Sequence, residues 1–177
     1  VNGARESGAY IDKLWRRTFR QFGITHARPV NNILVLGIAG GTVIHLLHAL
    51  YPRAHITGID IDSVMIDVGK KYFFLDTIKN LRCICKNAKE FISSFKGPRY
   101  DLIIIDIFIG PDVPDFVLST VFQKNVKKQV KHDGCVLINY LCQPGYEHKA
   151  AKLFTLLQSL YNNVQSVDHF NNRFFLA

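Results

Sequence analysis

Short apolar runs alternate with longer amphipathic segments along most of the chain. The runs are rich in Ile, Leu and Val and hold few polar residues, which is typical of parallel strands that helices cover on both faces. Apolar positions in the longer segments recur with helical spacing. The pattern predicts strands at residues 33–36, 55–59, 81–85, 101–106 and 135–140. It predicts helices at about residues 9–21, 43–50, 63–74, 88–95, 115–131 and 147–161.

The carboxyl-terminal end of the chain has a different pattern. Residues 164–168 and 173–176 flank Asn171 and Asn172 and predict two antiparallel strands. With the strands above, they predict an α/β fold: a Rossmann-like, doubly wound, mostly parallel seven-stranded sheet with a C-terminal antiparallel hairpin and helices on both faces. Residues 1–30 are expected to form a lead-in and a helix packed on the core, and residues 31–177 the Rossmann-like part of a single domain.

A glycine turn follows the first predicted strand. It reads Gly37-Ile-Ala39-Gly40-Gly41-Thr, so it is G-x-x-G-G, and no Lys-Ser or Lys-Thr follows as in a P-loop. Glycines let the backbone approach a ligand closely, and the start of the next helix supplies N–H groups. Asp60 ends the second strand at close to the ~20-residue spacing seen between a glycine turn and the acid that binds ribose hydroxyls. The alternative is that these glycines only permit tight strand-to-helix packing.

Polar residues mark the carboxyl ends of the other strands, the edge where open α/β sheets bind ligands. Asp62 is expected to cap the third helix. Asn87 suits either contact with an adenine ring or a helix cap, and the sequence favours neither. Asp106 lies at the ligand edge and Asp101 at the opposite edge, where a structural role is expected.

Composition and charge narrow the function classes. The chain is 48% hydrophobic, but no apolar run approaches the ~20 residues that span a bilayer, and the start lacks the apolar segment of a secretion signal. We therefore expect a cytoplasmic protein with no membrane contact. The cysteines lie in or beside apolar runs without metal-ligand spacing, which predicts reduced thiols and no metal: Cys83, Cys85, Cys135 and Cys142. The net charge of +8 favours anionic partners and opposes polycations.

The ordered segments LGIAGGT, GIDID, KNAKEF, YDLIIIDIF and HDGCVLINYL resemble the motifs of class I S-adenosylmethionine-dependent methyltransferases, in particular their spermidine-synthase-like branch. The opening NGARESGAY also resembles the segment that leads into the catalytic domain of that branch, with Glu6 in place of its usual Gln. The resemblance implies S-adenosylmethionine, or its decarboxylated form, as cofactor. It implies the cofactor-binding residues Gly37, Ala39, Gly40, Gly41, Asp60, Ile61, Asn87, Ala88 and Asp106.

Departures from the family pattern favour methyl transfer. Polyamine aminopropyltransferases usually carry a further Asp-Pro pair after the fourth-strand aspartate, whereas this chain reads Asp106-Ile-Phe-Ile-Gly-Pro. The amino-terminal β domain that helps to enclose a polyamine is also missing from this sequence. With the basic charge, these differences predict a methyltransferase of unknown acceptor. Aminopropyl transfer and a non-catalytic nucleoside-binding or regulatory module remain the alternatives.

Methyl transfer needs reactants held in line and water excluded, and it needs no covalent residue. Asp106 is the candidate to orient or deprotonate an attacking amine, and Tyr140 to add a wall or hydroxyl. Their alternatives are a loop-anchoring carboxylate and a packed aromatic ring. We expect a small-molecule acceptor, with an amine among the options, and a homodimer among the possible assemblies. Nucleic acid ranks last, because the basic residues do not interleave with aromatic ones.

Overall fold

The computed structural model describes residues 8–177 of the chain. The opening residues 2–7, including Glu6, lie outside the described residues. In chain order the elements are α1 (Ala9–Gln21), β1 (Asn32–Leu36), α2 (Thr42–Leu50), β2 (His55–Asp60), α3 (Ser63–Phe73), η1 (Leu75–Thr77), β3 (Leu81–Cys85), α4 (Ala88–Ser94), β4 (Tyr100–Ile105), η2 (Asp115–Leu118), α5 (Thr120–Gln129), β5 (Val130–Leu141), α6 (Glu147–Leu160), β6 (Gln165–His169) and β7 (Asn172–Leu176).

The strands form one seven-stranded sheet in the order β3-β2-β1-β4-β5-β7-β6. The pairs from β3 to β5 are parallel, and β7 is antiparallel to both β5 and β6. The predicted mostly parallel sheet with its closing hairpin is therefore confirmed. The chain moves outward from β1 to β3 and then crosses to β4 on the other side of β1. The crevice beyond the carboxyl ends of β1 and β4 is the topological switch point, where this class of fold binds ligands.

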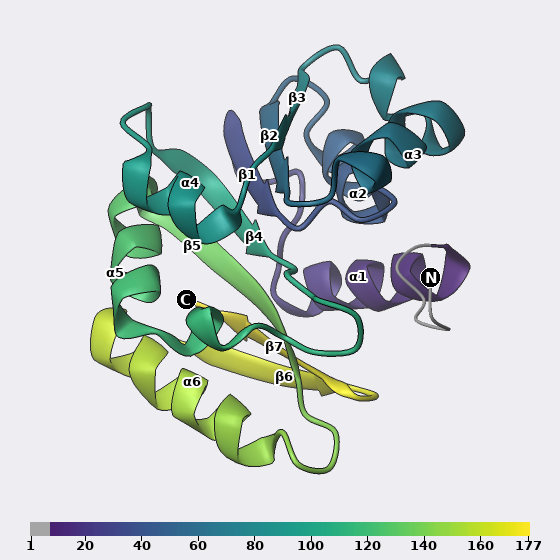
Figure 1. Ribbon diagram of the computed structural model, residues 1–177. Coiled ribbons are helices and arrows are strands. Elements are labelled where there is room, and N and C mark those ends of the chain that lie inside the picture. The colour runs from purple at the N-terminus through teal and green to yellow at the C-terminus, as the bar shows by residue number, and fades with distance from the viewer. Residues whose placement is uncertain (1–7) are drawn as a thin grey trace.

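Helices cover both faces of the sheet, as predicted (Figure 1). One core joins α1, α2 and α3 to one face, and the other joins α4, α5 and α6 to the opposite face. Trp15 of α1 is fully buried and packs edge-on against Phe174 of β7, with ring centroids 5.1 Å apart. The helix that precedes the glycine turn is thus part of the first core. No helix within residues 8–177 has the length and apolar character needed to cross a membrane.

Two segments differ from the sequence prediction. The helix expected at 115–131 is divided into η2 and α5, because Ser119 adopts an extended conformation between them. Residues 132–134, which link the predicted helix at 115–131 to the predicted strand at 135–140, form an irregularity inside β5, where the pairing jumps from Tyr100–Val130 to Leu102–Cys135. Asp101 lies opposite this irregularity and holds it: it forms a 2.7 Å ion pair with Lys131 and accepts the backbone N–H groups of Asn31 and Asn32. The structural role expected for Asp101 is confirmed.

Candidate functional site

The switch point brings the backbone of Gly37 against that of Asp106. The Asp106 N–H donates to the Leu36 carbonyl at 2.8 Å, continuing the β1–β4 pairing past the strand ends. A Cβ added to Gly37 would lie 1.9 Å from the Asp106 carbonyl oxygen, and Gly37 has a φ of +93°. Only glycine fits here, because a side chain would meet both a rigid backbone atom and an unfavourable conformation.

The rest of the turn curls back so that α2 can begin. Ala39 has a φ of +47°, unusual for a residue with a side chain, and Gly41 has a φ of +85°. The Gly41 N–H donates to the Ile38 carbonyl at 2.9 Å, and a Cβ on Gly41 would meet the side chain of Leu75 at 2.6 Å. Leu75 is buried and belongs to η1, a 3-10 helix that the sequence did not predict. It packs against both Gly41 and Gly69 of α3, and so it holds the glycine turn against α3.

Asp60, at the carboxyl end of β2, is bonded to the glycine turn. Its Oδ2 accepts the N–H groups of Ile38 at 2.8 Å and Ala39 at 3.1 Å, and its Oδ1 accepts the N–H of Asp62 at 3.0 Å. A carboxylate oxygen has two lone pairs, so Oδ1 keeps one acceptor position while Oδ2 is saturated. The sequence predicted bonds from a ribose diol. The Asp60 carboxylate can therefore accept one ribose hydroxyl. It could accept the second only if the N–H group of Ile38 or Ala39 gave up its bond to Oδ2.

Asp62 caps α3, as the sequence predicted. Its carboxylate accepts the N–H groups of Val64 and Met65 and caps α3. Between the two acids, Ile61 is 61% exposed, so an apolar side chain lies beside Asp60 at the ligand edge.

Asn87 caps α4, one of the two roles that the sequence left open. Its Oδ1 accepts the Lys89 N–H at 2.9 Å, and Ala88 begins the helix beside it. The amide still has its Nδ2 donors, which the cap does not use. Capping α4 and donating to a purine edge are therefore compatible roles for the same side chain.

Asp106 is partly buried directly after β4, and its Oδ1 accepts a 2.9 Å bond from Asn139 Nδ2. Burial raises the pKa of the Asp106 carboxyl to about 6, the bond from Asn139 lowers it, and the nearby charge of Asp60 raises it. A carboxyl with a pKa near neutrality is suited to general-base chemistry. The sequence did not single out Asn139, although an amide inside an otherwise apolar strand was a usable signal.

Tyr140 is not beside Asp106. It follows Asn139 in β5, so its side chain lies on the opposite face of the sheet, where it is fully buried in the core under α5 and α6. Its hydroxyl has no hydrogen-bond partner among residues 8–177. Burial, with the nearby Asp115 and Tyr146, raises its pKa to about 12. This geometry matches the packed aromatic that the sequence offered as the alternative, and Asn139 occupies the position next to Asp106.

The loop after Asp106 is fastened to the start of α6. Ile109 and Asp112 form an isolated antiparallel bridge around Gly110, which restrains the shape of the loop. The Tyr146 hydroxyl donates to Asp112, and Lys149 Nζ lies 3.0 Å from Asp115 Oδ1. Both carboxylates that follow Asp106 in the loop are therefore directed at α6.

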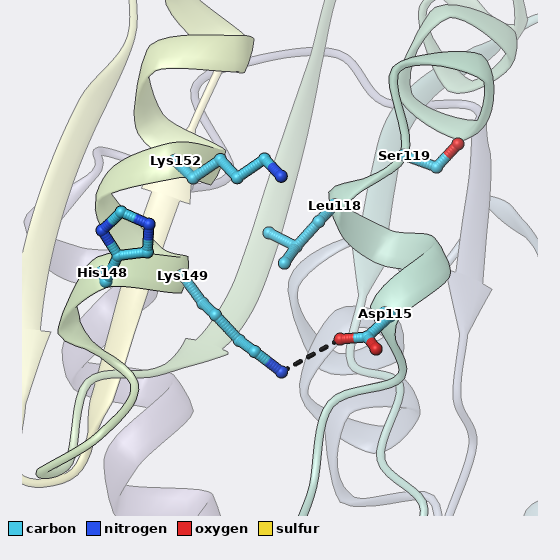
Figure 2. Close-up of a pocket in the computed structure, with 6 residues that line it drawn as sticks. All are labelled: Asp115, Leu118, Ser119, His148, Lys149 and Lys152. Carbon is cyan, nitrogen blue, oxygen red and sulfur yellow. Dashed lines mark hydrogen bonds and ion pairs between the residues drawn. The ribbon is translucent and has the colours of Figure 1, made fainter.

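A cavity of about 470 Å³ lies between α6 and the η2–α5 segment, beyond this loop (Figure 2). Figure 2 shows Lys149 reaching across it to Asp115, with Lys152 above and Ser119 on the far wall. None of the residues predicted to bind cofactor lines it. Its walls are charged and lie at the surface, whereas the switch point brings together the glycine turn and two carboxylates.

Comparison with protein families gives a match over most of the chain. The model of the spermine/spermidine synthase domain matches residues 17–168. The chain belongs to this family. It therefore lies within the S-adenosylmethionine-dependent methyltransferase superfamily, as the motifs implied, and it is a member of a family of transferases.

Curated relatives of this spermine/spermidine synthase-domain protein fall into two activities. A polyamine aminopropyltransferase of Vibrio vulnificus is 29% identical over 133 residues, which cover 73% of this chain and 44% of that protein. An eEF1A lysine and N-terminal methyltransferase homolog of Drosophila melanogaster is 27% identical over 120 residues, 63% of this chain and 18% of that protein. The chain spans less than half the length of either relative.

Solved structures share the fold at low identity. A probable spermidine synthase from Corynebacterium glutamicum superposes with a TM-score of 0.79 at 16% identity, covering 99% of this chain and 65% of that one. Human methyltransferase-like protein 13, solved in complex with SAH, superposes with a TM-score of 0.73 at 20% identity. The match covers 88% of this chain and 74% of that one. Both likenesses support the doubly wound fold described above.

The residues at the switch point fit a nucleoside with a charged sulfur substituent. Gly37 lets β1 and the residue after β4 approach closely, Asp60 keeps one acceptor position for a hydroxyl, and Asn87 keeps amide donors for a base. Asp106 adds a carboxylate on the other side of Gly37. The open acceptor on Asp60 and the open donors on Asn87 are the kinds of group that bind a ribose hydroxyl and a purine edge.

Proposed function

We propose that this chain is an S-adenosylmethionine-dependent methyltransferase that acts on an amine acceptor. The observation that carries the proposal is a single carboxylate with one open oxygen: Asp106 Oδ1 accepts from Asn139, and its Oδ2 accepts no hydrogen bond within residues 8–177. Asp112 and Asp115, the next acids in the loop, are bonded to Tyr146 and Lys149. A diamine or polyamine calls for two anionic positions, one for each charged end, whereas one amine needs one. The basic net charge of +8 further disfavours a polycation.

The cofactor would be held mainly by three side chains and by the amino-terminal turn of α2. Gly37 and Gly41 shape the turn beside it, Asp60 Oδ1 would accept a ribose hydroxyl, Ile61 would pack on the base, and Asn87 Nδ2 with Ala88 would border its edge. When bound, the cofactor supplies a methyl group on a positively charged sulfur, which a nucleophile displaces in line. The chain has no need of a covalent intermediate.

Asp106 acts on the acceptor. A protonated amine has no lone pair, so its nitrogen must lose a proton before it can attack. With a pKa of about 6, the Asp106 carboxyl is ionised at neutral pH and takes up that proton more readily than an unperturbed aspartate. Its open oxygen would also orient the nitrogen, because Asn139 holds Oδ1. The N–C bond forms as the C–S bond breaks.

Aminopropyl transfer from decarboxylated S-adenosylmethionine is the second candidate, and one feature favours it. The N–H groups of Ile38, Ala39 and Gly41, which could bind a cofactor carboxylate, are already used inside the turn. The amino-terminal turn of α2 is then left as the main source of donors for that carboxylate. The relative from Vibrio vulnificus carries the same activity in its name.

Calorimetric titration with S-adenosylmethionine, decarboxylated S-adenosylmethionine and methylthioadenosine tests the proposal. We expect the carboxylated cofactor to bind most tightly. A preference for the decarboxylated form would overturn methyl transfer in favour of aminopropyl transfer. Binding of methylthioadenosine alone would favour a nucleoside-binding module without catalysis, and an absence of binding to all three would remove the cofactor site.

A further inference from the structure

A short chain of side-chain amides leads from the hairpin to Asp106. Asn172 Nδ2 donates to Asn139 Oδ1 at 2.9 Å, and Asn139 Nδ2 donates to Asp106 Oδ1 at 2.9 Å. The three residues come from β7, β5 and the end of β4, and each link joins residues 33 positions apart in sequence. Asn139 is only 5% exposed, so its amide depends on these protein partners.

The register of the sheet explains why these two hydrogen bonds form. β5 pairs antiparallel with β7 so that Asn139 lies opposite Phe174 and Leu141 opposite Asn172. Asn139 and Asn172 are therefore diagonal neighbours on one face of the sheet, within reach of each other. Phe174, directly opposite Asn139 and two residues from Asn172, packs against Trp15 of α1. The hairpin cannot slip without moving Asn172 away from β5.

The order of donors along this chain has a chemical consequence. The Asn139 amide can present either its NH₂ or its carbonyl oxygen to Asp106, and the two orientations have nearly the same shape. The NH₂ end stabilises a carboxylate, whereas the carbonyl end would repel it and favour the protonated acid. Asn172 donates to the Asn139 carbonyl and so holds that end away from Asp106.

We propose that Asn172 is a positioning residue for the transferase reaction: by fixing the amide orientation of Asn139, it keeps Asp106 ionised and directs its open oxygen at the acceptor. The catalytic part of this inference rests on the proposed role of Asp106. The effect on Asp106 itself does not, because it depends only on the amide chain. The charged group that acts on Asp106 is Asp60, at the end of β2 and separated from β4 by β1, and its carboxylate opposes ionisation. The amide chain works against burial and against Asp60.

Titration of the Asp106 carboxyl carbon by ¹³C NMR, without cofactor, tests the amide chain directly. In Asn172→Ala the Asn139 amide loses its anchor, and we expect the pKa of Asp106 to rise by roughly half a unit. In Asn172→Asp the new side chain can only accept, so Asn139 must turn its NH₂ toward it and its carbonyl toward Asp106. We expect a rise of roughly one unit or more there. The order, with Asn172→Asp above Asn172→Ala, is the signature of amide orientation.

Asn171 supplies matched controls. It precedes Asn172 in the same hairpin, its side chain is exposed, and the structure gives it no side-chain hydrogen bond within residues 8–177. Asn171→Ala and Asn171→Asp repeat the same two changes one residue away, including the added charge. They are expected to leave the Asp106 titration within ~0.2 unit of wild type. Equal shifts in the Asn171→Asp and Asn172→Asp variants would overturn the proposal, because charge alone would then explain the effect.

Catalysis provides the second readout. If the carboxylate of Asp106 accepts the proton, the acid limb of the kcat/KM profile moves to higher pH in the Asn172 variants by the shift seen in NMR, while cofactor affinity is unchanged. A shifted titration with an unmoved activity profile would retain the amide chain and reject Asp106 as the base. An unshifted titration in both Asn172 variants rejects the inference whatever the activity.

Discussion

The two sides of the switch point are held by different kinds of contact. On the proposed cofactor side, backbone N–H groups of the glycine turn bond to one another and to the Asp60 carboxylate within about one strand–helix–strand unit. On the acceptor side, Asp106 is joined to β5 and β7 by side-chain amides, and its loop is joined to α6 by Asp112 and Asp115. Backbone contacts around the glycine turn restrict which residue types fit there. The contacts around Asp106 are made by side chains, so a single substitution can change them. This difference suits a family whose members share a cofactor type but differ in acceptor.

Gly37→Ala is the strongest test of the backbone-held side. The new Cβ would lie 1.9 Å from the Asp106 carbonyl oxygen at a φ of +93°, so we expect a loss of roughly 4 kcal/mol in the free energy of unfolding. Gly145 has a nearly identical φ of +92° but open space around its Cβ position. Gly145→Ala should lose only ~1 kcal/mol, the cost of the conformation. Urea unfolding measures both, and equal losses would contradict the clash.

Asp106→Asn probes the acceptor side through stability and activity together. Because the folded-state pKa is raised from 3.8 to about 6, folding favours the protonated acid, and ionisation costs stability as pH rises through that window. At pH values above about 6, Asp106→Asn should be more stable than wild type by about 3 kcal/mol, and at pH values below about 4 this gain should vanish. Transferase activity should fall sharply. Urea unfolding from pH 3.5 to 8 measures this difference in the free energy of unfolding. A difference that did not change with pH would contradict the raised pKa of Asp106.

Asp60→Asn tests whether the cofactor side depends on a carboxylate. An amide cannot accept the N–H groups of Ile38, Ala39 and Asp62 at both of its ends, so the turn should loosen. We expect affinity for S-adenosylmethionine to fall by roughly 10- to 100-fold, measured by calorimetry. Asp62→Asn is the matched control, because Asn caps a helix about as well as Asp and should leave affinity unchanged. Equal affinity in both variants would assign Asp60 a structural role only.

Asn87→Asp gives the smallest expected effect and separates two roles of one side chain. The variant keeps the cap on α4 and places a negative charge at the helix start, so stability should change by less than ~0.5 kcal/mol. It loses the Nδ2 donors, and affinity for S-adenosylmethionine should fall by roughly tenfold. Asn87→Ser, which also caps, should show a similar loss. Thermal unfolding and calorimetry distinguish the two effects, and full affinity in both variants would leave Asn87 as a cap alone.

The local structure around the glycine turn could be predicted from the sequence because its contacts are close together along the chain. The spacing from Gly37 to Asp60 and the pair Asp60/Asp62 fix a strand, a turn and a helix cap within a short stretch, and the predicted strand ends agree with the structure. The hydrogen bonds from the turn's own N–H groups to the Asp60 carboxylate could not be predicted. Those bonds depend on the positive φ of Ala39, which residue type did not predict.

The acceptor side could not be predicted in the same way. Asn139 and Asn172 meet Asp106 only through the register of β5 with β7, which the sequence does not specify. Tyr140 was proposed for catalysis from its place near a strand end, yet the alternation of a strand turns it into the core while Asn139 faces Asp106. The break at Ser119 that separates η2 from α5 also escaped prediction, because the apolar spacing continues through it.

The most direct test of the central claim is an NMR titration of the ¹⁵N-labelled chain with SAH. If the cofactor binds at the switch point, the backbone amide signals of Gly37, Gly41, Ile61, Ala88 and Asp106 shift together and saturate with one affinity. The amide signals of Ser119 and His148, which line the cavity, do not shift. Shifts confined to that cavity between α6 and α5, with the glycine turn unmoved, would contradict a cofactor site at the β1–β4 switch point.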